Sequence, residues 1–199
     1  SNYLFAYNKN KIIAFGKSGS KLFQEEIEGN IEKKSTVMNK NGTCIVATDQ
    51  DPYILNVFSI SGKKSLSLKL KEPLGGVDIS DDDKYIIYYY ELFVGDSLKY
   101  IMKLVDIKTG KEIWERALSL YTEEFPEIYI GKEHILLNYY RAQNKPNPYT
   151  LYLYDFKGNL IGYTNSPQKP LLSTDRKYIL IFDVQKVFMY EINPYTTIK

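Results

Sequence analysis

The 199-residue sequence has few of the side chains that build metal sites and nucleophilic catalysts. It contains one cysteine, Cys44, and one histidine, His134. A single cysteine excludes an intramolecular disulfide, and a single histidine excludes a histidine cluster for zinc. Cys44 lies in the apolar run Thr43–Ala47, where we expect a buried, unreactive thiol. Any Ser-His-Asp arrangement would depend on His134 alone, so we expect a structural role for it.

The sequence also lacks net charge and long apolar runs. Its 26 basic and 24 acidic residues give a formal charge of +2, which excludes partners that are attracted by bulk charge. Tyr139-Tyr140-Arg141 would suit base stacking, but with this charge we predict no nucleic-acid partner. No run approaches 18 apolar residues, so a membrane would be reached only through a segment outside this chain. Because the chain begins Ser1-Asn2, we expect such a segment, an export signal or an anchor, to precede it.

Alanine is scarce as well, and this argues against a helical protein. Five alanines stand against 21 Ile, 19 Tyr, 10 Thr, 9 Phe and 8 Val. β-Branched and aromatic side chains fit a pleated, half-buried surface. We therefore predict an all-β fold.

The sequence contains an internal repeat of about 45 residues, marked by glycine turns between strand-like segments. The glycines stand at Gly19, Gly62, Gly110 and Gly158. Between them recurs a short strand, a polar turn and a longer apolar strand, as in Val77–Ser80, Asp81–Asp83 and Lys84–Tyr90. Each complete repeat thus predicts four antiparallel strands, with a Gly75-Gly76 bend between two repeats. The predicted repeat units are residues 1–30, 31–72, 73–120, 121–168 and 169–199.

The third glycine turn, Val105–Trp114, has the sequence Val-Asp-Ile-Lys-Thr-Gly-Lys-Glu-Ile-Trp. It resembles the hairpin of the quinoprotein-like β-propeller repeat superfamily (PQQ-type and WD40-like), whose tryptophan docks against a neighbouring blade. Phe23 and Leu66 replace the tryptophan in the first two copies, and the fourth copy has Gly162 there and a turn one residue shorter. The resemblance implies an all-β, propeller-like array of four-stranded antiparallel blades, but no particular function.

The strand count predicts an incomplete ring. We expect 18 strands, with three in the first unit, four in each middle unit and three in the last, or about 4.5 blades. The chain is therefore predicted to be a single propeller that closes imperfectly or part of a larger one.

The longer predicted connections gather at one edge of the blades. They are residues 91–97, 141–148, 120–125 and 163–169, and such loops commonly carry function on a rigid scaffold. We therefore predict a non-catalytic binding or sensory module that recognises a protein or glycan, without a cofactor or metal. The predicted binding residues are Phe93, Asp96, Tyr121, Tyr139, Tyr140, Arg141, Asn144 and Tyr149.

Two alternatives remain open at this point. One is a carbohydrate-active enzyme that uses two carboxylates from Asp49, Asp51, Glu123 and Glu124 on the same face. The other is a purely architectural propeller in an assembly. The Asp81–Asp83 triplet is not a catalytic candidate, because aspartates are favoured in tight turns for bonding to their own backbone. We predict an extracytoplasmic or cell-surface location, with a cytoplasmic one as the alternative.

Overall fold

The computed structural model describes residues 3–48, 50–95, 97–118, 126–131, 133–140, 146–173, 177–182 and 186–192, without the side chains of residues 32–35. Regular structure in these residues consists of β-strands alone. Accordingly, they include no helix with the length and apolarity needed to cross a bilayer. The all-β prediction is confirmed.

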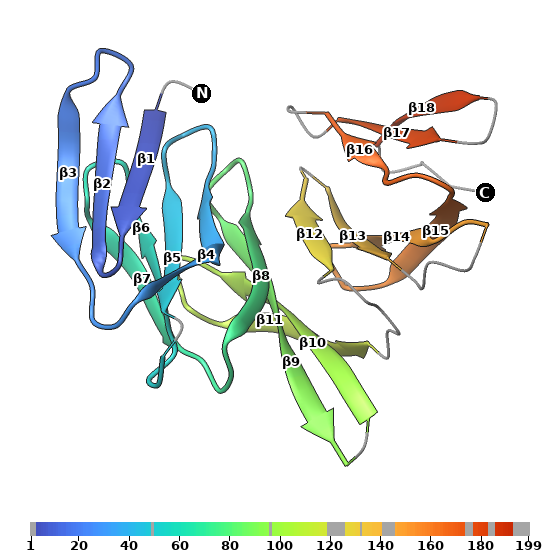
Figure 1. The fold of residues 1–199 in the computed structure, drawn as a ribbon, viewed down its shortest axis with the longest axis horizontal. Helices are drawn as coiled ribbons and strands as arrows, with labels where there is room; N and C mark the ends of the chain where they lie inside the picture. Colours follow the sequence, from blue (N-terminus) through green and yellow to red (C-terminus); the bar gives the residue numbers. More distant parts are fainter. Residues whose placement is uncertain are drawn as a thin grey trace. The chain divides into compact units, whose positions relative to one another are not determined.

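Eighteen strands in the described residues form five antiparallel sheets (Figure 1). Sheet 1 contains β1 (Tyr3–Asn8), β2 (Lys11–Gly16) and β3 (Lys21–Glu26); sheet 2 contains β4 (Ile31–Met38), β5 (Cys44–Thr48), β6 (Ile54–Phe58) and β7 (Lys64–Lys69); sheet 3 contains β8 (Leu74–Ile79), β9 (Tyr85–Val94), β10 (Ser97–Asp106) and β11 (Glu112–Leu118). Sheet 4 contains β12 (Glu127–Ile130), β13 (His134–Tyr140), β14 (Tyr149–Asp155) and β15 (Leu160–Ser166); sheet 5 contains β16 (Leu171–Leu172), β17 (Tyr178–Phe182) and β18 (Val187–Glu191). The predicted distribution of three, four, four, four and three strands is therefore observed in this part of the chain.

The chain divides into two compact units. Ser1–Leu118 holds sheets 1 to 3, and Ser119–Lys199 holds sheets 4 and 5. The single propeller domain remains a prediction.

Sheet 2 has apolar side chains on both faces, because alternate residues of a strand point to opposite sides. Cys44 and Val46 belong to a buried cluster with Ile12 of sheet 1. Ile45 and Ala47 belong to a second cluster with Ile86 of sheet 3. Burial raises the pKa of the Cys44 thiol to about 12, so the thiol stays protonated as expected. The strand is thus a layer between two cores.

Each glycine hairpin contains a glycine in the left-handed region and a register shift beside it. Such a glycine is typical of a three-residue hairpin loop closed by a bulge. The N–H groups of Gly19, Gly62 and Gly158 each donate to a carbonyl three residues earlier, at 2.9 Å. Gly110 instead bonds to Asp106, four residues earlier. The prediction that the fourth hairpin has a turn one residue shorter than the others was therefore wrong. The third hairpin has a turn one residue longer, and the turns of the other three are equal in length.

Neighbouring hairpins of the first unit are joined by a side chain that packs on a glycine. A Cβ atom on Gly62 would lie 2.9 Å from the Phe23 Cβ, and one on Gly110 would lie 3.3 Å from Leu66 Cδ1. Phe23 and Leu66 each stand four residues after the glycine of their own hairpin. They therefore dock against the next repeat, as the resemblance implied for tryptophan.

The predicted bend at Gly75-Gly76 was wrong, because both glycines belong to strand β8. The Tyr89 ring of β9 lies against them, and a Cβ atom on Gly76 would approach its Cε1 atom to 2.7 Å. The register of β8 and β9 shifts at the same place, between Leu74 and Gly76. The pair of glycines therefore makes room for a buried aromatic ring.

Candidate functional site

The described residues include five of the twelve side chains predicted as binding residues or carboxylate candidates. Asp49, Asp96, Tyr121, Glu123, Glu124, Arg141 and Asn144 lie outside them. Asp51 is exposed in the connection between β5 and β6. Within the described part of the chain, no group of three His, Cys, Asp or Glu side chains is arranged to hold a metal ion.

Phe93 lies on a hairpin that extends beyond its sheet. β9 pairs with β8 only as far as Tyr90, and β10 pairs with β11 only from Tyr100 onward. Residues 91–94 and 97–99 continue as a two-stranded ribbon past these neighbours (Figure 1). The prediction of a loop over residues 91–97 was therefore wrong, since Gly95 with its φ of 60° closes a tight turn instead.

Two apolar side chains near the end of this ribbon are exposed. The Phe93 side chain is 73% exposed, and Val94 beside it is exposed as well. Leu92 packs against the core between sheets 2 and 3 and anchors the base of the ribbon. An aromatic residue held on a paired strand loses little further freedom when a partner covers it.

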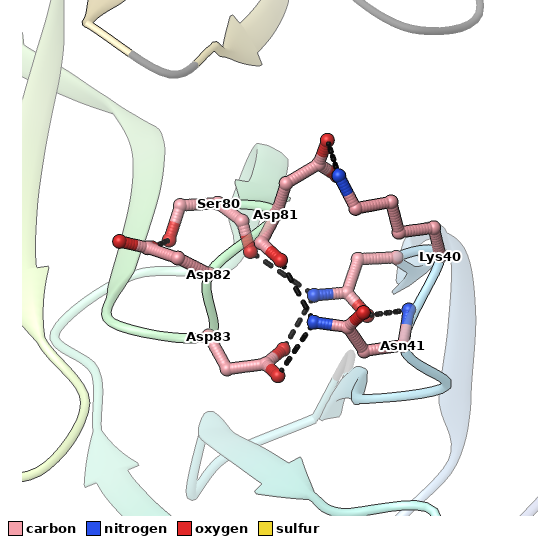
Figure 2. Close-up of polar contacts among 7 residues, drawn as sticks. Lys40, Asn41, Ser80, Asp81, Asp82 and Asp83 are labelled. Carbon is pink, nitrogen blue, oxygen red and sulfur yellow. Dashed lines mark hydrogen bonds and ion pairs between the residues drawn. The ribbon is translucent and has the colours of Figure 1, made fainter.

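The acidic turn Asp81–Asp83 connects two sheets, as Figure 2 shows. Asn39, in the turn before β5, donates through Nδ2 to the Ser80 carbonyl oxygen at 3.0 Å and to Asp83 at 2.5 Å. Its Oδ1 atom accepts the N–H groups of Asn41 at 3.0 Å and Thr43 at 3.1 Å. All four hydrogen-bonding positions of the buried Asn39 amide are thus occupied.

The three carboxylates of this turn also have partners. Lys40 binds Asp81 at 2.8 Å, and Asn41 donates to Asp83 at 2.9 Å. Partial burial opposes ionisation of Asp82, but hydrogen bonds from Ser80 and Lys84 outweigh it and lower the pKa of this carboxyl group. The cluster is therefore structural, as predicted, but the predicted reason fits Asp82 alone of the three. Asp82 accepts the Lys84 N–H group, whereas Asp81 and Asp83 bind side chains of the neighbouring turn.

Lys103 is a charged side chain that lies between two core residues on one face of β10. It stands on β10 between Ile101 and Val105, both of which belong to the core between sheets 2 and 3. Its Nζ atom lies 2.7 Å from Glu112 and 2.5 Å from Glu115. Burial alone would lower the pKa of the lysine, but the bonds to both glutamates outweigh it and raise the pKa. The amine is therefore held as an ammonium ion, a form without nucleophilic reactivity.

The tyrosines predicted at the end of sheet 4 divide between its two faces. Tyr139 is buried and stacks on Tyr152, with ring centroids 5.5 Å apart and hydroxyl oxygens at 3.2 Å. Tyr140 and Tyr149 form a cross-strand pair on the opposite face, with centroids 5.1 Å apart. Both rings of this pair are partly exposed.

A polar group lies next to this pair on the same face of sheet 4. Asn138 of β13 pairs with Glu127 of β12, and its Nδ2 atom lies 3.5 Å from the Glu127 carboxylate. The carboxylate also accepts the Tyr129 hydroxyl at 3.1 Å and binds Lys169 at 2.5 Å. Sequence reasoning missed Asn138, although an amide within the apolar run of residues 134–140 was a usable signal.

His134 begins the same strand and is buried. Burial lowers the pKa of its imidazole, against smaller opposing effects of Glu133 and Asp155. The side chain is therefore neutral near pH 7.

The comparisons with known proteins bear on the fold. No protein-family model and no curated protein matches the chain. Among solved structures, an acylaminoacyl peptidase from Pyrococcus horikoshii is similar with a TM-score of 0.63 and 13% identity, over 96% of this chain and 36% of that one. A hydrazine synthase from Kuenenia stuttgartiensis is similar with a TM-score of 0.57 and 14% identity, over 90% of this chain and 58% of that one. A functionally unknown protein from Desulfotomaculum acetoxidans DSM 771 gives a TM-score of 0.53 and 13% identity, over 98% and 77% of the two chains.

These likenesses show the fold alone. The chain spans little more than half of the hydrazine synthase chain and about a third of the peptidase chain. Both are propeller-containing proteins, which supports the coarser part of the expected resemblance. No family model supports the quinoprotein-type repeat.

Proposed function

We propose that the chain is a non-catalytic binding module of propeller type that recognises a protein or a glycan through the surface that carries the β9–β10 hairpin. The observation that carries the proposal is the ribbon of residues 91–95 and 97–99, which holds the exposed Phe93 beyond the sheet. Aromatic residues are among those that contribute most to binding energy at protein interfaces.

The propeller arrangement is part of this proposal. It is supported by the repeated four-stranded sheets, by the packing of Phe23 and Leu66 on the glycines of the next hairpins, and by the propeller-containing structural neighbours. A compact chain of 199 residues has a radius of gyration of about 16 Å. A clearly larger value in small-angle X-ray scattering would contradict one closed domain.

The binding proposal is tested with a matched pair of surface variants. The intact chain is screened on a glycan array and against a displayed peptide library, and each ligand is then measured with a Phe93→Ser/Val94→Ser variant. We expect the affinity to fall by about 30-fold, because truncation of a central interface residue costs about 2 kcal/mol. Leu4→Ser serves as the control, since Leu4 is 64% exposed on β1, in a different sheet. Equal loss in both variants, or none in the hairpin variant, would contradict the proposal.

A further inference from the structure

The backbone of β9 bonds alternately to its two neighbours in sheet 3. Ser80, directly after β8, donates to the Tyr85 carbonyl oxygen at 2.9 Å, so the odd-numbered residues of β9 face β8. The register of β9 with β10 is unbroken from Tyr85 to Val94, so this alternation continues to the end of the strand. Glu91 and Phe93 therefore turn their backbone groups toward the side of β8.

The strand β8 ends before it reaches these groups. Its first pair with β9 joins Leu74 to Tyr90, and the residue before Leu74 is Pro73. Proline has no N–H group, so Pro73 cannot donate to the Glu91 carbonyl oxygen, the next acceptor along β9. Among the described residues, no strand pairs with β9 beyond Tyr90 on this side. The open edge thus presents the Glu91 carbonyl oxygen and both backbone groups of Phe93.

The side chains at this edge combine an apolar surface with a negative charge. Phe93 is opposite Leu98 of β10, and Glu91 is opposite Tyr100, all on one face of the ribbon. Phe93 is exposed, and Leu98 and Glu91 are partly exposed. Burial and the Glu91 carboxylate together raise the pKa of the Tyr100 hydroxyl to about 12. A strand at this edge would place one side chain against Phe93 and another, two positions away, against Glu91.

We propose that the surface of the β9–β10 hairpin recognises a protein, by pairing residues 91–94 with an extended segment of the partner as an added strand. Main-chain hydrogen bonds provide affinity in this mode, and side chains provide the sequence preference. An apolar side chain covers Phe93, and a lysine or arginine two positions away pairs with Glu91, because opposite charges across a strand pair are favourable. A glycan has no alternating N–H and C=O groups with which to continue the ladder. The inference rests on the proposed function and deepens it by naming the partner class.

The probe is a linear peptide. A displayed library of linear peptides is selected on the intact chain, and the best binder is synthesised with an N-methyl group at one residue at a time. We expect a loss of affinity of about tenfold at two residues separated by one, whose N–H groups bond to the Glu91 and Phe93 carbonyl oxygens. The residue between them should tolerate the methyl group with a loss below about twofold. A peptide that binds as a helix, or through side chains alone, would show no such alternation.

The backbone of the ribbon contains its own control. Hydrogen exchange of the assigned backbone amides is measured with and without saturating peptide. The Phe93 N–H group should exchange at least about tenfold more slowly in the complex, because it gains a hydrogen bond. The Val94 N–H group faces Ser97 in a bonded pair, so it should be protected in both states.

Glu91→Gln tests the charge preference, with Lys99→Gln as its control. Lys99 is opposite Leu92, on the other face of the ribbon. For a peptide that contains a lysine or arginine, we expect the affinity to fall about threefold in Glu91→Gln and to stay unchanged in Lys99→Gln. Unchanged affinity in Glu91→Gln would overturn the assignment of a basic partner residue.

Three results would overturn strand addition as a whole. They are the enrichment of no peptide, N-methyl sensitivity without alternation, and rapid exchange of the Phe93 N–H group in the complex. The Phe93→Ser/Val94→Ser variant separates these failures from failure of the proposed function. If this variant loses affinity for a selected ligand while strand addition fails, the hairpin is still the binding surface. If it loses none, the proposed function fails as well.

Discussion

Replacement of Asn39 with alanine tests whether the two polar turns in Figure 2 hold sheets 2 and 3 together. The change removes two bonds within the turn, from the N–H groups of Asn41 and Thr43, and two bonds across the sheets, to Ser80 and Asp83. Asn39 is buried, so water has little access to the groups that lose their partner.

The expected loss follows from these bonds. A hydrogen bond between neutral groups contributes about 1 kcal/mol to stability, and one to a charged group about 2 kcal/mol. Water can replace the partner of the exposed Asn41 N–H group fully and that of the half-buried Asp83 carboxylate in part, but not the partners of the buried Thr43 and Ser80 groups. We therefore expect the free energy of unfolding to fall by about 3 kcal/mol.

The assay is urea unfolding followed by the fluorescence of the only tryptophan, Trp114, which lies in the same unit. Asn41→Ala is the matched control, because it also removes two bonds across the sheets, to Asp81 and Asp83, but at an exposed position. We expect it to cost less than about 1 kcal/mol. The reasoning would be refuted if Asn39→Ala lowered the free energy of unfolding by less than about 0.5 kcal/mol. It would also be refuted if both variants lost the same free energy while the slope of that free energy against urea concentration stayed unchanged.

Three further predictions follow from burial and backbone geometry. The Cys44 thiol, with its pKa raised to about 12, should resist alkylation at pH 8 in the folded chain and react fully in urea; rapid labelling without urea would show that the site opens. The lowered pKa of His134 means that the unfolded chain binds a proton more readily, so stability should fall as the pH drops below about 6.5, and His134→Gln should flatten that slope in melting experiments between pH 7.5 and 5. Gly62→Ala should destabilise by about 2 kcal/mol, because the glycine has a φ of 81° and its Cβ would press on Phe23; Gly19→Ala, with a similar φ and open space around it, should cost less, and equal urea midpoints for the two would contradict the packing argument.

The sequence predicted the features that depend on local chemistry. The glycine hairpins, the polar Asp81–Asp83 turn and the strands of each repeat follow from turn residues and apolar runs, and all are observed. It failed where the reason for a residue lies on another strand. Gly75 and Gly76 look like a bend until Tyr89 of the next strand is seen against them.

The candidate site was harder to predict for the same reason. Residues 91–97 looked like a loop because Gly95 and polar residues interrupt the apolar run, and only pairing with residues 97–100 makes them a ribbon. Tyr139 and Tyr140 looked equivalent in sequence, but alternation along β13 sends them to opposite faces. Asn138 and Lys103 were overlooked because a single polar residue in an apolar strand has no local motif.

The double-sided burial of β5 has a consequence for how the chain finds its pairing. In a strand with one face in water, a slip of one residue carries apolar side chains into solvent and is strongly penalised. In β5 the same slip would exchange the side chains of two dry layers, because both faces are apolar. Burial therefore discriminates weakly between the correct alignment and its neighbour. The information that selects the correct alignment resides in the left-handed glycines at the hairpins, which allow the chain to reverse at one position only.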